Sequence, residues 1–87
     1  MAQEGQALLE KAAGQGHAYA MDALGSIHRV RKEHGQAVEW YMKGTEAGLP
    51  LSMFKLAEGL DTGEMVAVPD YAAAVYWYRR AAAAGLA

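Results

Sequence analysis

The side chains in this sequence that could hold a metal ion are three histidines. His17, His28 and His34 lie 11 and 6 residues apart, so no two share a helical face at the i, i+4 spacing, and the sequence contains no cysteine. Zinc sites in proteins use histidine and cysteine ligands at short, regular spacings. The pattern therefore favours surface or half-buried histidines, and we expect neither a metal centre nor another cofactor.

A short basic stretch, residues 28–34, could bind phosphate or an acidic peptide. It carries three cations, Arg29, Arg31 and Lys32, with no aromatic residue among them. Sites for single-stranded nucleic acid combine basic groups with aromatic side chains on which bases stack. The net charge of −2 adds no general attraction for polyanions. A solvated loop is therefore favoured, and binding of nucleic acid or an anionic ligand through this stretch is the alternative.

Aromatic side chains cluster at two places, Trp40-Tyr41 and Tyr76-Trp77-Tyr78. Such clusters can cage a ligand cation, but these two lie 37 residues apart (77 − 40 = 37), which favours repeated packing. We expect both tryptophans to be largely buried between neighbouring helices. No Ser-His-Asp arrangement or glycine-rich phosphate loop is present, so the sequence predicts a protein that is not an enzyme.

The same interval relates Gly48 to Gly85, and an eroded third copy spans residues 8–16. Self-similarity at a fixed period of this size is typical of a helical repeat array. The 87 residues are 53% hydrophobic and 21% charged, as expected of one small globular domain. We expect no signal peptide and no membrane span, with the cytoplasm as the default compartment.

Hydrophobic periodicity and glycine stops predict five helices. Their expected ranges are residues 3–14, 18–30, 33–46, 50–60 and 70–84. Asp70 is placed to cap the last of them, and Gly25 and Ala57 are expected at close helix–helix contacts. Tyr41 and Tyr78 occupy matching positions and are expected to fill the same kind of interface.

The two full copies share an ordered set of small, aromatic and glycine residues. One copy reads Gly16, Ala20, Leu24-Gly25, His28, Glu33, Ala37, Trp40-Tyr41, Gly44 and Gly48. The other reads Gly48, Ser52, Leu56-Ala57, Leu60, Gly63, Val66, Asp70, Ala74, Trp77-Tyr78, Ala81-Ala82 and Gly85. This order resembles the Sel-one-like repeat, a relative of the tetratricopeptide repeat. The first copy departs from the family pattern because the connection between its helices is five residues shorter than in the second.

The resemblance implies an all-α fold, a right-handed α-α superhelix (solenoid) of antiparallel helix pairs with about five helices. One domain, residues 1–87, would contain a partial repeat at 1–16 and repeats at 17–48 and 49–85. Modules of this family act as scaffolds and adaptors of protein complexes. The first helix of each pair lines the concave face, and here those helices are residues 18–30 and 50–60.

The candidate protein-binding residues lie on the expected exposed side of these two helices. They are Tyr19, Asp22, Ala23, Ser26 and Arg29 on the first helix, and Leu51, Lys55 and Glu58 on the second. They form either a mixed-charge groove for a peptide or an ordinary polar face. We therefore expect a non-enzymatic module that binds a protein or peptide rather than nucleic acid or a membrane. A structural fragment of a longer repeat protein is a further alternative.

The last predicted helix carries apolar residues on more sides than one neighbour can cover. They are Val75, Tyr78, Ala81, Ala82 and Ala84. In a solenoid each repeat covers the apolar side of its neighbour. We therefore expect an uncapped apolar strip on this helix, through which the chain self-associates.

Overall fold

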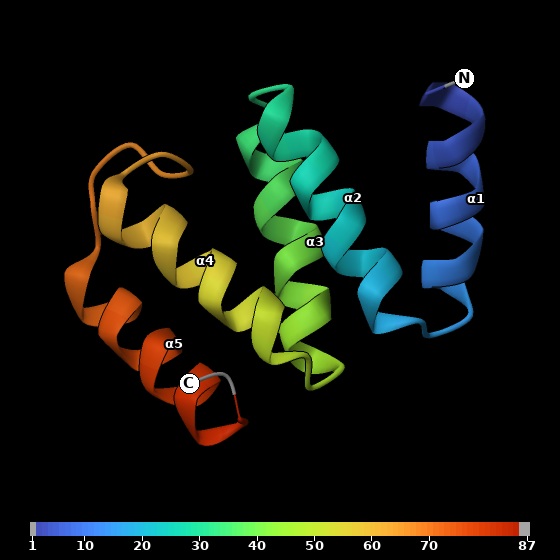
Figure 1. The fold of residues 1–87 in the computed structure, drawn as a ribbon. Coiled ribbons are helices and arrows are strands. Elements are labelled where there is room, and N and C mark those ends of the chain that lie inside the picture. The colour runs from blue at the N-terminus through green and yellow to red at the C-terminus, as the bar shows by residue number, and fades with distance from the viewer. Residues whose placement is uncertain (1, 86–87) are drawn as a thin grey trace.

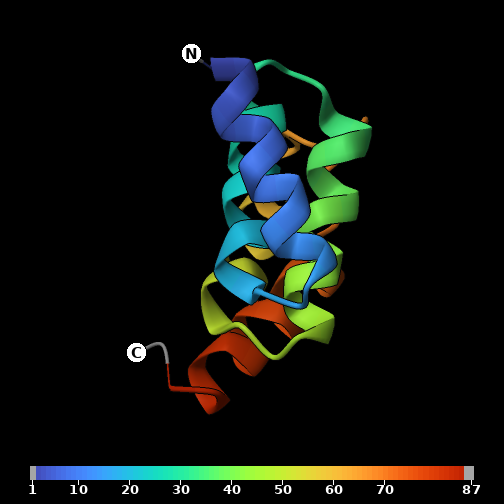
Figure 2. The same ribbon diagram turned by 90° about the vertical axis from the view of Figure 1, so that its right-hand side faces the viewer.

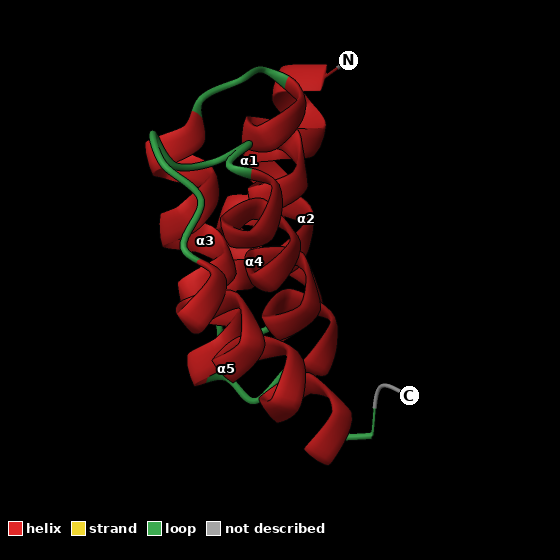
Figure 3. Ribbon diagram, turned by 90° about the vertical axis from the view of Figure 1, so that its left-hand side faces the viewer, coloured by secondary structure: helices red, strands yellow, loops and turns green. Residues whose placement is uncertain are grey.

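Five α-helices of 13 residues each form the computed structural model of this chain, which describes residues 2–85 (Figure 1). They are α1 (Ala2–Gly14), α2 (Ala18–Val30), α3 (His34–Glu46), α4 (Pro50–Thr62) and α5 (Tyr71–Ala83). Figure 3 shows only helices and loops in the described part of the chain. The all-α prediction is confirmed, with every helix boundary within two residues of its expected place. Met1, Leu86 and Ala87 lie outside the described residues.

Successive helices run antiparallel and follow one another in chain order across the molecule (Figure 1). The most extensive packing joins α2 to α3 and α4 to α5, while α1 packs on α2 and α3 packs on α4. Figure 2 views this row from the α1 side and shows the N- and C-terminal ends well separated. The chain therefore consists of two helix pairs with one further helix beside them, as expected of a helical repeat array.

The connections within the two pairs differ in length. Residues 31–33 join α2 to α3, whereas residues 63–70 join α4 to α5, a difference of five residues (8 − 3 = 5) that matches the sequence comparison. Lys32 turns the short connection with a φ of 62°, in the left-handed region that costs a non-glycine residue roughly 1 kcal/mol or more. Gly63 begins the long connection at a φ of 74° without that steric cost.

The residues before α3 and α5 begin these helices differently. Asp70 caps α5 as predicted, because its Oδ1 accepts a hydrogen bond from the Ala73 N–H at 3.1 Å. Glu33 precedes α3 but makes no side-chain cap. Its carboxylate is hydrogen-bonded instead to Nδ1 of His28 at 2.8 Å, so it ties the end of α2 to the start of α3.

Tyr41 of α3 lies at the centre of the core and is fully buried. Its ring belongs to a cluster with Ala37, Leu56 and Met65. Gly25 of α2 makes room for that ring, because a Cβ at this position would lie 2.6 Å from Cδ1 and Cε1 of Tyr41. The predicted close helix–helix contact at Gly25 is therefore confirmed.

The second tyrosine does not reproduce this environment. Tyr78 is only half-buried, and its ring meets Phe54 of α4 edge to face with the centroids 5.5 Å apart. Tyr41 is covered by α2 and α4 together, whereas α5, which carries Tyr78, makes its extensive packing with α4. The expectation that both tyrosines fill equivalent interfaces is therefore wrong, although Ala57, which α4 contributes to this pair, is fully buried as expected.

The two tryptophans are mostly buried, as predicted, with only the minor part of each residue exposed, and they pack against the core clusters of neighbouring helices. Each indole lies beneath a cation, with Lys43 Nζ 4.3 Å from the centroid of the Trp40 ring and the Arg80 guanidinium 5.0 Å from that of Trp77. The cations are one helical turn further along, where i, i+3 neighbours meet on a helix surface. The indoles therefore close the edges of the core, and the long basic side chains cover them.

The exposed apolar surface of α5 consists partly of other residues than those predicted from the sequence. Ala81 is buried against α4 and Tyr78 is half-buried, so these two apolar residues belong to the packed side of the helix rather than to the exposed strip. Val75 is 48% exposed, as expected for a residue of the strip, and Tyr76 beside it is 53% exposed. An apolar surface is therefore present on α5, but it is centred on Val75 and Tyr76.

The difference in burial predicts unequal costs for removing the two tyrosines. Tyr41→Ala should lower the free energy of unfolding by about 3–5 kcal/mol, as for other large-to-small changes in a core. Tyr78→Ala should cost only about 1–2 kcal/mol, because less of its surface is withdrawn from water. Urea titrations followed by far-ultraviolet circular dichroism measure both values, and equal costs would contradict the asymmetry.

The surroundings of Gly25 and Gly35 predict that replacing each glycine by alanine changes the stability of the chain in opposite directions. Gly25→Ala should destabilise the chain by about 1–3 kcal/mol, because the new methyl group meets the enclosed ring of Tyr41. Gly35→Ala is the matched control, since nothing lies within 4 Å of a Cβ there. That change should stabilise the chain by up to about 1 kcal/mol through helix propensity. Thermal melts distinguish the signs, and stabilisation by both changes would refute the contact.

Candidate functional site

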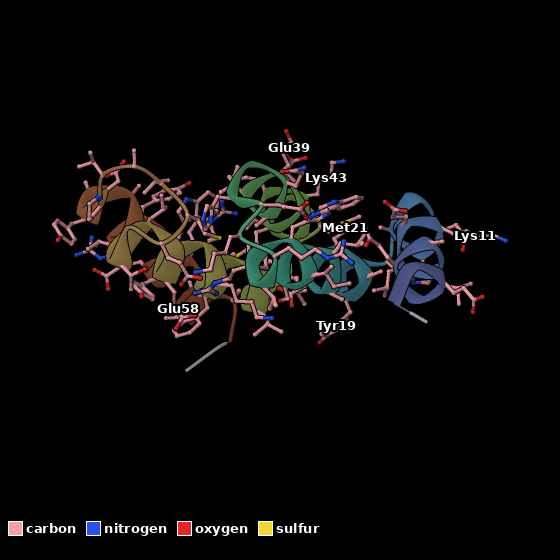
Figure 4. All side chains as sticks on the ribbon, turned by 90° about the horizontal axis from the view of Figure 1, so that it is seen from above. Lys11, Tyr19, Met21, Glu39, Lys43 and Glu58 are labelled. Atoms are coloured by element: carbon pink, nitrogen blue, oxygen red, sulfur yellow. The ribbon has the colours of Figure 1, made fainter. Side chains whose placement is uncertain are left out.

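The predicted binding residues come from α2 and α4, the first helices of the two pairs. Figure 4 shows Tyr19 of α2 and Glu58 of α4 on one side of the molecule, with Glu39 and Lys43 of α3 on the opposite side. The two first helices thus present these two predicted residues on a common side, which we call the α2–α4 face.

Asp22 of α2 is buried, with 4% of its surface exposed, so the expectation that it lines the exposed side is wrong. Its Oδ1 accepts a hydrogen bond from Ser52 Oγ at 3.0 Å, and its Oδ2 accepts one from Lys55 Nζ at 2.7 Å. A buried carboxylate is costly unless it is paired and hydrogen-bonded, and α4 meets both needs. These three residues, the Asp22 bridge, fasten α2 to α4.

The Asp22 bridge is continuous with the core. Lys55 Nζ also donates to Ser26 Oγ at 3.1 Å, and Ser26 shares a 3.0 Å hydrogen bond with the hydroxyl of Tyr41. Ser52 fits against α3 only because Gly44 has no side chain, since a Cβ on Gly44 would overlap the Ser52 hydroxyl. Polar contacts and close backbone approach therefore set the relative position of α2, α3 and α4 together.

Arg29, near the end of α2, pairs with two carboxylates. Its Nε and Nη2 donate to the two oxygens of Glu64 at 2.8 and 2.7 Å, and its Nη1 lies 3.8 Å from Oε1 of Glu58. The hydrogen bonds with Arg29 lower the pKa of Glu64, and those with Glu64 raise the pKa of Arg29, so both groups are charged at neutral pH. Because the Glu64 side chain is 44% exposed, we expect the pair to contribute about 1 kcal/mol or less.

The charges predicted to line a groove are thus largely matched with one another. Asp22 pairs with Lys55, and Arg29 pairs with Glu58 and Glu64. Surface charges that already have intramolecular partners offer little attraction to a ligand. The α2–α4 face therefore contains a neutralised polar seam rather than a free mixed-charge groove.

An apolar hollow of about 300 Å³ lies at the N-terminal ends of α2 and α4, beside the C-terminal end of α5. Its lining residues are Tyr19, Leu49, Pro50, Leu51, Ala84 and Gly85. The structure therefore brings together Tyr19, which is 72% exposed, and Leu51, which is half-buried, from the predicted set. The other lining residues were not predicted, although equal lengths of antiparallel α4 and α5 return the end of α5 to the start of α4.

The remaining predicted residue, Ala23, is half-buried and lines neither this hollow nor the other one described on α5. In the basic stretch, Nη1 of Arg31 donates to Gln6 of α1 at 2.8 Å, and Arg29 is matched by carboxylates. Arg31 and Lys32 are the exposed cations of that stretch. The basic stretch therefore has less unpaired positive charge than its sequence suggested.

Two further observations bear on the chemistry that is possible here. Partial burial and the nearby carboxylates of Asp61 and Glu58 raise the pKa of the Tyr78 hydroxyl, so that it is neutral at physiological pH. Within residues 2–85, no three histidine, cysteine, aspartate or glutamate side chains are grouped closely enough to bind a metal ion. The described helices also include none with the length and apolar character required to cross a bilayer.

Comparison with known proteins identifies the kind of repeat. The family described as Sel1 repeat matches three consecutive segments, residues 2–17, 18–49 and 50–86. The three matches together span almost the whole chain. No curated protein and no solved structure gave a match.

The Asp22 bridge predicts a strong energetic coupling between α2 and α4. Asp22→Ala should lower the free energy of unfolding by about 2–4 kcal/mol, because it leaves Lys55 and Ser52 without their acceptor. A double-mutant cycle with Lys55→Ala measures the coupling. The Arg29–Glu64 pair is the matched control and should show a coupling of about 1 kcal/mol or less. Equal couplings in the two cycles would contradict the role given to burial.

Proposed function

The chain belongs to the Sel1 repeat family, and we propose that it is a non-enzymatic module that binds a protein or peptide segment. Sel1 repeats are helical modules that generally mediate protein interactions. The observation that carries the proposal is the apolar hollow on the α2–α4 face, beside which Tyr19 is exposed. Exposed aromatic groups next to an apolar depression are typical anchor points of protein interfaces.

The expected ligand is an extended segment with one large apolar side chain. That side chain would occupy the hollow between Tyr19 and Leu51 and displace water from their surfaces. α2 and α4 both begin without a side-chain cap, so the N–H groups of Ala18, Tyr19 and Leu51 are available to carbonyl oxygens of the segment. Pro50 has no N–H, and the Ser52 N–H already donates to the carbonyl oxygen of Leu49. The Asp22 bridge supports binding indirectly, because it holds the two helices in place before the ligand arrives.

A peptide library displayed on phage and selected on the purified chain tests the proposal. Selected peptides should share a large apolar residue, and their affinity should fall about tenfold or more in the Tyr19→Ala and Leu51→Ser variants. Tyr71→Ala is the matched control, because Tyr71 is 64% exposed and lies at the other end of α5 from the hollow. Undiminished binding by both hollow variants would refute this site.

The alternative, binding of nucleic acid or another polyanion, would rest on Arg31 and Lys32. Binding to backbone phosphates weakens steeply as salt increases, whereas binding through an apolar anchor does not. Oligonucleotide binding that is lost at high salt and in the Arg31→Ala/Lys32→Ala variant would favour this alternative.

A further inference from the structure

The outer surface of α5 forms a second apolar hollow, with a volume of about 370 Å³. It is lined by Ala72, Val75, Tyr76, Arg79, Arg80 and Ala83. We call this surface the α5 outer face. The opposite side of α5 packs on α4 through the buried residues Ala74 and Ala81. Val75 and Tyr76 are therefore large exposed groups on a helix whose other side is already occupied.

The charge of this surface has one sign. α5 contains Arg79 and Arg80 but no aspartate or glutamate between its ends, although the whole chain has a net charge of −2. In the described part of the chain, neither arginine has a carboxylate within ion-pair distance. The Arg80 guanidinium stacks on Trp77 at 5.0 Å, which leaves the edges of the guanidinium plane available to a carboxylate.

In the preceding repeat, α3 is the helix equivalent to α5, and its corresponding residues are packed rather than exposed. Val38 and Met42 of α3 pack against the core cluster that includes Leu56 of α4. The positions 37 residues later are Val75 and Arg79, both exposed (38 + 37 = 75; 42 + 37 = 79). An apolar side chain is thus retained at Val75, while the thioether of Met42 is replaced by the cation of Arg79. A group that covers α5 must therefore offer apolar side chains and carboxylates together.

We propose that the α5 outer face binds an amphipathic helix of another protein, with an apolar stripe over Val75 and Tyr76 and carboxylates on Arg79 and Arg80. A helix antiparallel to α5 would bring its own N-terminal turn beside the two arginines. Acidic residues are favoured in that turn by the helix dipole. The antiparallel orientation is also the one that successive helices of this chain adopt (Figure 1). This binding surface is additional to the hollow at Tyr19 and Leu51.

A second copy of the chain fits this surface poorly. Two α5 outer faces in contact would have four arginines and no carboxylate of their own. An antiparallel, two-fold contact would place Arg79 and Arg80 against the positive N-terminal end of the other α5. Asp70, the acidic residue at that end, already accepts the Ala73 N–H. The charges therefore favour an acidic partner over the self-association expected from sequence.

Two synthetic peptides of about 15 residues test the proposal, since a helix of that length covers one side of α5. Both carry the same leucine stripe, and their first turns carry three glutamates in one peptide and three lysines in the other. The glutamate peptide should bind about tenfold tighter by fluorescence anisotropy. Arg79→Glu/Arg80→Glu should reverse that preference, and Val75→Ser should weaken the binding of both peptides.

Lys11→Glu/Lys32→Glu is the matched control, because it changes the net charge equally at exposed positions away from α5. It should leave the preference intact, and circular dichroism verifies that each variant is folded. The proposal is overturned by equal or absent binding of the two peptides, or by a preference that survives the arginine reversal. Sedimentation that reveals self-association abolished by the same reversal would assign the surface to a second copy and also overturn it. Binding lost in Tyr19→Ala but not in the arginine variant would place the peptide in the other hollow.

Discussion

The burial of one carboxylate, Asp22, constrains the arrangement of the three central helices. A charge removed from water requires partners at fixed positions, and α4 supplies Ser52 and Lys55 while the chain of hydrogen bonds continues through Ser26 to Tyr41. The aromatic core and the polar contact are therefore parts of one network. Displacing any of the three helices disturbs an apolar contact and a hydrogen bond together.

A polar contact of this kind determines position more strongly than it raises stability. The apolar side chains of α3 and α4 would tolerate small shifts, because the hydrophobic effect is not directional. Moving α4 by one helical turn would instead leave the Asp22 carboxylate buried without its donors, Ser52 and Lys55, at a cost far above that of the shift in packing. We therefore interpret the Asp22 bridge as the element that sets the register of the second repeat on the first. The close approach of Gly44 and Ser52 requires the same register.

Local signals explain why so much of the fold could be predicted from the sequence. Glycine stops, the Asp70 cap and the 37-residue period act within or between neighbouring helices, so they are legible without coordinates. The burial of Asp22 could not be predicted in this way, because it depends on how closely α4 approaches α2. The hollow was only partly predicted for the same reason, since Tyr19 and Leu51 meet the end of a third helix there.

Repetition in sequence also conceals differences in environment between the repeats. Counting from the first residues of α2 and α4 (50 − 18 = 32), the position of Asp22 is occupied in the second repeat by Phe54, which is 37% exposed and packs on Tyr78. The first repeat thus directs the carboxylate of Asp22 from α2 to α4. The second has an aromatic ring at the equivalent position, where it packs on α5 of its own pair, and it carries two arginines on α5. A lysine like Lys55 would find the phenyl ring of Phe54 there in place of the carboxylate of Asp22. The second repeat therefore copies the fold of the first with different chemistry at the equivalent positions.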